Sequence, residues 1–231
     1  MSNNNCALRT IIKHHERYYI VHYSCQSLYD DNEGLSPRIA AIAVLHLSSK
    51  QMVSFSTHAI AEELKYKREQ CAEHADEIEK KLLEDFAKFL SERRDKLWLH
   101  WNMKNLTYGF EHIEHRFRLL VGRDMPSLAV ERRINIDDII VERYGEEYIS
   151  KPRMQKLMEK NGGIRRNFLN GPQEVEAFKS LEFSKMHSST VSKVEFFKDV
   201  IQLMKKGQLK TDSNGIGLIR YLKVASQKLL A

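Results

Sequence analysis

The sequence predicts an α/β fold in which helices flank a mixed sheet and the C-terminal part is helical. Three strand-like segments follow one another through short connections within the first 60 residues, and an amphipathic helix comes next. A fourth strand-like segment then leads through a polar turn into another helix. A strand that is reached through a crossover helix can lie parallel to the first strand. We therefore expect a three-strand antiparallel meander extended by one parallel strand.

The three meander strands are indicated by composition and alternation. Residues 17–27, RYYIVHYSCQS, are rich in aromatic and β-branched types, which favour strands. Residues 38–47, RIAAIAVLHL, are apolar almost throughout, as in a central strand that is covered on both faces. A tight reversal at 48–51 leads into the third strand, expected at 52–60 because polar and apolar residues alternate there.

The fourth strand is expected at residues 97–101, LWLHW, directly before a turn that contains Asn102 and Asn105. Trp98 and Trp101 lie three residues apart in this strand. Because successive strand residues point to opposite faces, the two indole rings should lie on opposite sides of the sheet.

Helices are expected where apolar residues recur at intervals of three and four. The first spans about 69–94, and a second follows the fourth strand with the stripe Leu106, Phe110, Ile113, Phe117 and Leu120. Beyond Gly122 the chain should be mostly helical. The expected helices there are 136–145, Pro152 to Lys160, about 172–180 and about 184–206.

The chain divides into three expected parts: an N-terminal extension at 1–16, a main domain at 17–206, and a linker with a C-terminal helix at 207–231. Leu218, Leu222, Ala225 and Leu229 share one stripe of that last helix. A detached helix of this length is marginal in water, so we expect it to dock either back on its own domain or, as we favour, in the groove of a protein partner.

Composition limits the function classes. Of the 231 residues, 42% are hydrophobic and 29% charged, and no apolar run approaches the roughly 20 residues of a membrane span. The N-terminus lacks a signal-peptide core, so we expect a cytoplasmic protein with no membrane partner. Cys6, Cys25 and Cys71 are odd in number and widely spaced, which fits a reducing compartment. The net charge of +6 makes nucleic acid a reasonable partner.

The order of three meander strands, helix, parallel strand with a polar exit and several helices resembles the DEDD-type 3′-to-5′ exonucleases, a family of RNase H-like fold. The resemblance covers roughly residues 17–206. It implies two metal ions about 4 Å apart, held by four carboxylates that come from the first strand, the turn after the fourth strand and a late helix. The ions would orient a water that attacks the phosphodiester.

The positions that match the family's motifs carry no acid in this chain. The first-strand motif falls on His22, Tyr23, Ser24 and Cys25, and the second resembles the family in Asn102 while its acidic position falls on Asn105 or Leu106. His187 matches the histidine of the late helix, but Ser192 stands five residues further on. Because magnesium requires anionic oxygen ligands, the resemblance implies a degenerate site at His22, Asn102, Asn105 and His187.

Two other sites stay open. Displaced acids such as Asp30, Asp31 or Asp137 would give an active nuclease, and magnesium or manganese is expected only in that case. His22 and His100 with His112, Glu111 and His115 would give a soft-metal site, although the helix face of His112 and His115 is expected to be solvated. Otherwise we expect no cofactor.

The expected function is therefore a catalytically degenerate exonuclease-like subunit that binds nucleic acid or assembles with a partner, for example in a nucleic-acid-processing or antiviral defence complex. The residues expected to contact phosphates are Arg132, Arg133, Arg165, Arg166 and Lys193. The alternatives are an active metal-dependent nuclease and a pure protein-interaction module.

Overall fold

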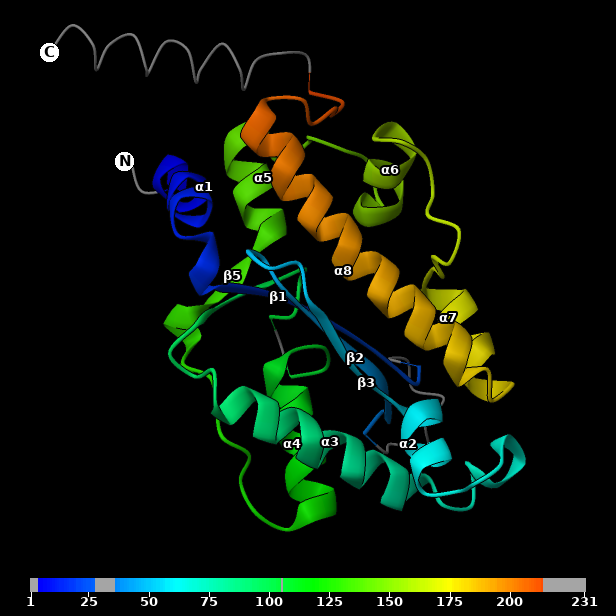
Figure 1. Cartoon of the computed structure of the whole chain (residues 1–231). Helices are drawn as coiled ribbons and strands as arrows, with labels where there is room; N and C mark the ends of the chain where they lie inside the picture. Colours follow the sequence, from blue (N-terminus) through cyan, green and yellow to red (C-terminus); the bar gives the residue numbers. More distant parts are fainter. Residues whose placement is uncertain (1–3, 28–35, 105, 214–231) are drawn as a thin grey trace, which may run out of the picture.

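The structure is a computed structural model that describes residues 4–27, 36–104 and 106–213. A five-stranded sheet lies between helices on both faces (Figure 1). The strand order is β3-β2-β1-β4-β5, in which β2 is antiparallel to both β1 and β3 while β4 is parallel to β1 and β5. The expected α/β class with a mixed sheet is confirmed. Within these residues no helix has the length and apolar character needed to cross a membrane.

The strands follow the apolar segments of the sequence closely. They are β1 Tyr18–Cys25, β2 Ile39–His46, β3 Met52–Ser56, β4 Leu97–His100 and β5 Arg133–Asn135. The sequence pattern predicts the first four but not β5, because three residues are too few to show alternation. This short strand extends the sheet through parallel pairing of Arg133 with Trp98 and Asn135 with His100.

The helices occupy most of the remaining described chain. They are α1 Asn4–Lys13, α2 Thr57–Glu63, α3 Ala75–Ser91, α4 Phe110–Val121, α5 Ile136–Tyr144, α6 Arg153–Lys160, α7 Gly171–Lys179 and α8 Phe183–Lys206. Short 3₁₀ turns lie at His15–Arg17, Arg68–Gln70 and Val130–Arg132.

Three boundaries differ from the sequence prediction. The first helix was expected at about 69–94, but α3 spans Ala75–Ser91 and a 3₁₀ turn occupies Arg68–Gln70. The third strand was expected to reach residue 60, but α2 begins at Thr57, whose hydroxyl donates to the carbonyl of Ala40 at 3.1 Å. Alternation alone does not show where a strand gives way to a helix. Leu106 was expected on the buried stripe of α4, yet it lies outside the helix and is 79% exposed.

The sheet is buried on both faces. Val21, Tyr23 and Trp98 pack with α2, α3 and α4 on one side, whereas Ile20 and Leu99 pack with α1, α5, α6 and α8 on the other. Trp101 belongs to the second side, so the two tryptophans do lie on opposite faces as expected.

Both ends of the described chain also contribute to the core. Leu8 and Ile11 of α1 are buried against the α8 side of the sheet, although residues 1–16 were expected to be an extension. After α8, Leu209 is buried and the backbone N–H of Asp212 donates to the carbonyl of Tyr148 at 2.7 Å. The expected linker therefore packs on the domain as far as residue 213. Residues 214–231, including the predicted C-terminal helix, lie outside the described residues.

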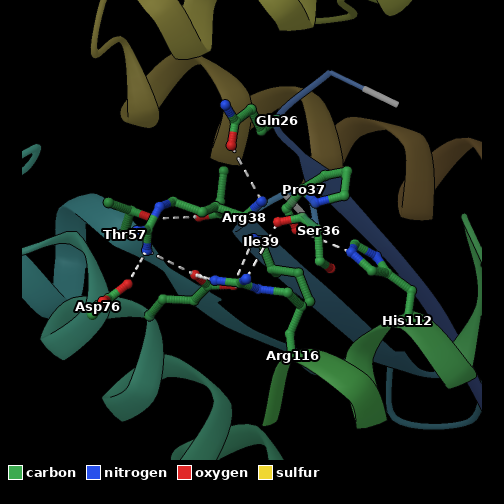
Figure 2. A network of polar contacts seen from close by, with 11 residues as sticks. Gln26, Ser36, Pro37, Arg38, Ile39, Thr57, Asp76, His112 and Arg116 are labelled. Carbon is green, nitrogen blue, oxygen red and sulfur yellow. Dashed lines mark hydrogen bonds and ion pairs between the residues drawn. The ribbon is translucent and has the colours of Figure 1, made fainter. Parts of the chain in front are cut away.

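A buried carboxylate joins α3 and α4 to the start of β2. Glu79 is 2% exposed and accepts hydrogen bonds from Nε and Nη2 of Arg116, at 2.8 and 2.5 Å. It also accepts from the backbone N–H of Ile39 at 2.9 Å. Arg38 reaches the same carboxylate at 3.4 Å and Asp76 at 2.5 Å, so two arginines converge on these acids (Figure 2).

We predict that Glu79→Ala lowers the free energy of unfolding by about 3–5 kcal/mol, because the variant leaves the Arg116 guanidinium buried without its partner. Urea unfolding at neutral pH measures the difference. The matched control is Glu84→Ala on the same helix, a partly exposed side chain for which a change under about 0.5 kcal/mol is expected. Equal effects of the two substitutions would contradict a special role for the buried pair.

Candidate functional site

The carboxyl ends of the parallel strands β1, β4 and β5 share one edge of the sheet. His22 lies in β1 two residues beyond Ile20, the last residue that pairs with β4, while Asn102 follows β4 and Asn135 ends β5. In open α/β sheets, ligands bind outside the carboxyl ends of the strands, at the place where the strand order reverses direction. Here the order reverses between β1 and β4, because β2 and β3 lie on one side of β1 and β4 and β5 on the other. This edge is the strongest candidate site.

Asn102 and Asn135 are joined by a reciprocal amide network. The backbone N–H of Asn102 donates to Oδ1 of Asn135 at 2.8 Å, and Nδ2 of Asn135 donates back to Oδ1 of Asn102 at 3.0 Å. Asn102 has a φ of +53°, in the left-handed region that asparagine tolerates better than most residues. The turn therefore depends on asparagine for its backbone conformation as well as its side chain.

The two acids of the adjacent helix α5 are both engaged. Asp137 is buried and accepts from Tyr148 and from Arg153 at 2.9 Å, while Nδ2 of Asn102 donates to it at 3.2 Å. Burial and the adjoining Asp137 raise the pKa of the Tyr148 phenol. Asp138 accepts from Lys104 at 2.5 Å and from Asn135 at 2.9 Å.

His22 lies beneath α8 in an aromatic setting. Its ring meets Phe197 edge-on with centroids 5.4 Å apart, and Trp101 stacks on the same Phe197 at 5.4 Å. The Tyr108 hydroxyl lies 3.3 Å from the His22 ring nitrogens and donates to the carbonyl of Tyr23 at 2.8 Å. Burial holds the pKa of His22 well below its usual value, with further lowering by Lys193 and His100. The imidazole is therefore neutral at pH 7.

His100 is the second buried histidine at this edge. Its Nδ1 accepts the backbone N–H of Met103 at 3.2 Å, which places the ring proton of the neutral form on Nε2. Burial lowers its pKa to about 4, and the positive charge of Lys104 contributes.

Lys193 brings a cation into the same region from α8. It is 5% exposed, and its ammonium lies 2.7 Å from Oε1 of Glu174 on α7 and 5.3 Å from the centroid of the Phe168 ring. Burial raises the pKa of Glu174, while the ammonium of Lys193 acts in the opposite direction. This pair is internal, so Lys193 is not placed as the surface phosphate contact that the sequence suggested.

A pocket of about 800 Å³ opens beside the Asn102 network. It is lined by Trp101, Asn102, Asp137, Lys151, Pro152, Arg153 and Met154. Lys151 is exposed, and no ion pair joins it to another described residue. Lys151 precedes α6 and Arg153 is its first residue, at a point where the sequence shows only a proline flanked by two cations. Sequence reasoning treated Pro152 as a helix start and overlooked these side chains.

The structure does not bring His187 to this edge. Its Nε2 lies 2.7 Å from the Ser54 hydroxyl of β3, the edge strand farthest from β5 in the strand order, and its ring lies 5.0 Å from that of His58. Burial and the neighbouring His58 lower the pKa of His187. The α8 residues next to the β1 end are Thr190, which donates to Ser24 at 3.0 Å, and Phe197. Asn105, Asp30 and Asp31 lie outside the described residues.

The histidine metal site that the sequence left open is not assembled among the residues that the structure describes. His112 was expected on a solvated face, but it is buried, with Nε2 donating to the carbonyl of Pro37 at 3.0 Å and Nδ1 accepting from the Tyr23 hydroxyl at 2.9 Å. Both ring nitrogens are thus engaged. His115 on the same helix is exposed.

The four arginines expected to bind nucleic acid have different surroundings. Arg133 is nearly buried and pairs with Glu111 and Glu114, and Arg165 pairs with Asp199. Arg132 donates to the carbonyl of Asp95, and Arg166 is exposed with no ion pair to a described residue. Of the four, Arg132 and Arg166 are the ones whose charge is not already paired with a described acid.

The strand-end site thus combines neutral imidazoles, amides and hydroxyls with acids that are already bound to cations or tyrosine. Such a donor set suits recognition of a ligand by hydrogen bonds better than coordination of a hard divalent ion. No protein-family model matches this chain, and no curated protein matches it.

We predict that the free energy of unfolding falls as the pH drops from about 6.5 to about 4, in part because of His100. The unfolded histidine takes up a proton below its ordinary pKa of about 6.5, whereas the folded one does so only near 4. His100→Asn keeps an acceptor for Met103 but cannot titrate. It should reduce the pH slope by up to about 1.4 kcal/mol per pH unit.

Urea unfolding at a series of pH values measures this slope. The matched control is His115→Asn, which changes an exposed histidine of α4 and should retain the parent slope. A His100→Asn protein with the parent slope would show that His100 does not carry the effect.

Proposed function

We propose that this chain is a catalytically degenerate exonuclease-like subunit of RNase H-like fold that binds nucleic acid at its strand-end pocket. A protein partner would supply the chemistry of the complex. The segment after residue 213, where the sequence predicts an amphipathic helix, is the proposed docking element for that partner.

The fold supports the exonuclease-like part of the proposal. The three meander strands, the helix α3, the parallel strand β4 with its polar exit and the later helices follow in the order that the sequence resemblance implies. The resemblance also predicts that the first strand and the turn after the fourth meet at one edge. In the structure His22 contacts the Phe197 ring, and Trp101, the residue before Asn102, stacks on the same ring.

The observation that carries the proposal is the pairing of every described acid at this edge. Asp137 is held by Arg153 and Tyr148, Asp138 by Lys104, and Glu174 by Lys193. An acid that is neutralised by a neighbouring cation has lost most of its advantage as a ligand for magnesium, which gives up its water only to strongly anionic oxygen. Hydrogen bonding and phosphate contact remain as the functions that these residues can perform.

The pocket supports nucleic acid as the ligand. Its rim carries the exposed Lys151, its wall carries the amide of Asn102, and its volume of about 800 Å³ is within the range of nucleotide-sized sites. A lysine on a flexible stem contacts phosphate as a point charge and gives affinity without sequence preference. The net charge of +6 favours approach of a polyanion.

We predict that the purified protein does not degrade labelled single- or double-stranded DNA or RNA in the presence of magnesium or manganese. The reason is the pairing of Asp137, Asp138 and Glu174 with cationic neighbours. The assay compares the parent with Asp137→Asn and with Asp30→Ala/Asp31→Ala. Degradation that persists through repurification and disappears in either variant would replace this proposal with an active nuclease that uses displaced acids.

We predict that Lys151→Ala weakens binding to a single-stranded oligonucleotide and reduces the slope of log affinity against log salt concentration by about one, because one phosphate contact is lost. Fluorescence anisotropy over a salt series measures both quantities. Lys88→Ala removes an exposed lysine of α3 and serves as the charge-matched control. Equal salt slopes for the two variants would place the bound strand elsewhere, and absence of binding at low salt would favour a pure interaction module.

A further inference from the structure

A second pocket lies beside α2, which directly follows the edge strand β3, at the other end of the strand order from β5. It has a volume of about 520 Å³ and lies between α2, the Lys65–Arg68 segment and the first turn of α8. His58, Tyr66, Leu181 and Phe183 are among the side chains that line it. It shares no lining residue with the strand-end pocket.

Cations dominate the rim of this pocket. Lys65, Lys67, Arg68 and Lys185 line it together with the acids Glu62 and Glu182. Lys185 bonds Glu182 at 2.6 Å, and Arg68 donates to the carbonyl of Ser180. Lys65 and Lys67 are both exposed, and neither forms an ion pair with a described residue. Two positive charges on one short segment thus lie at the mouth of a cavity without an ion pair to a described residue.

The first turn of α8 adds further donors to the same wall. Phe183 and Ser184 line the pocket at the start of this 24-residue helix, and the N-cap residue Glu182 makes no side-chain capping bond. The N–H of Lys185 already donates to the carbonyl of Glu182 at 3.0 Å, so the N–H groups of Phe183 and Ser184 are the donors that face a ligand here. The first N–H groups of a helix carry partial positive charge and favour an anion.

The interior of the pocket has a different character from its rim. Ala61, Cys71, Leu181 and Phe183 provide apolar surface, and the Tyr66 ring is partly buried beside them. His58 also lines the pocket, and its Nδ1 is buried without a hydrogen-bond partner among the described residues. A ligand with an anionic group, a polar atom and an apolar or planar part would match these three features.

We propose that this pocket binds a small phosphorylated molecule of the nucleoside monophosphate class. The phosphate lies against Lys65, Lys67 and the first turn of α8, and the planar part enters toward Phe183 and Tyr66. The volume suits one such molecule, because small-ligand pockets measure roughly 300–1,000 Å³. This site is separate from the proposed polynucleotide site, so either proposal can fail without the other.

Titration of the full-length protein with AMP, inorganic phosphate and adenosine, followed by amide chemical shifts, tests the proposal. AMP should bind most tightly, since it engages both the rim and the interior, with shifts concentrated at Ala61, Tyr66 and Phe183. Lys65→Gln/Lys67→Gln retains the side-chain stems and should weaken AMP at least tenfold at low salt. Lys88→Gln, which removes an exposed charge on α3, should change it less than twofold.

Five results would overturn the proposal. Two concern affinity for the parent: no saturable shift at about 10 mM AMP, tenfold above the constant of a weak millimolar site, and equal affinity for AMP and adenosine. Two others are shifts confined to the strand-end pocket and an unchanged AMP affinity in Lys65→Gln/Lys67→Gln. The fifth comes from competition with an oligonucleotide, which tests whether the pocket takes its phosphate from a polynucleotide. Displacement of AMP from Tyr66 and Phe183 by the oligonucleotide would assign the pocket to a polynucleotide track instead of a small molecule. Melting temperatures of the variants, expected to equal that of the parent, exclude misfolding as the cause of lost binding.

Discussion

The arrangement of the sheet against the α3 and α4 layer depends on the hydrogen bonds that the buried Glu79 carboxylate accepts. This carboxylate accepts hydrogen bonds from Arg116 on α4 and from the backbone of Ile39 at the start of β2. A carboxylate in this setting is tolerated because its lone pairs are used by charged and backbone donors. Three elements that are distant in sequence are thereby fixed to one another (Figure 2). The position of β2 in turn fixes β1, with which it pairs over most of its length.

The same principle of internal charge pairing shapes the candidate site. At the ends of the parallel strands, each described acid has a cation or hydroxyl within hydrogen-bond distance, and each buried histidine is kept neutral by its surroundings. A site of this kind is already electrostatically compensated before a ligand arrives. It can form hydrogen bonds with a ligand and contact it through the exposed Lys151, but it offers little unpaired negative charge to a metal ion.

Periodicity predicted much of the fold because both faces of the sheet are covered by amphipathic helices. The runs at β1, β2 and β4 and the stripes of α3, α4 and α8 are direct consequences of burial. Periodicity did not predict an element that is very short, or the burial of a polar residue. β5 has three residues, and α2 begins within an alternating segment that is equally compatible with a strand. His112 was expected in solvent because the sequence does not show that Tyr23 and Pro37 provide partners for both ring nitrogens.

The sequence indicates the position of a residue where strand order fixes it, and fails to do so where helix packing decides it. His22 and Asn102 share an edge because β1 and β4 are parallel neighbours. His187 was matched to the family's histidine only by its position in the late helix. That position does not determine which strand the helix face meets, and the residue lies against Ser54 of β3 instead.

The number of basic residues likewise overstates the cationic surface. Arg116, Arg133 and Lys193 pair with buried or partly buried acids, so these pairs cancel within the net charge of +6 and do not attract a polyanion from solution. A count of charges cannot distinguish an internal ammonium from an external one, whereas burial can. The exposed cations beside cavities, Lys151 at one and Lys65 with Lys67 at the other, are where the remaining positive charge can meet an anionic ligand.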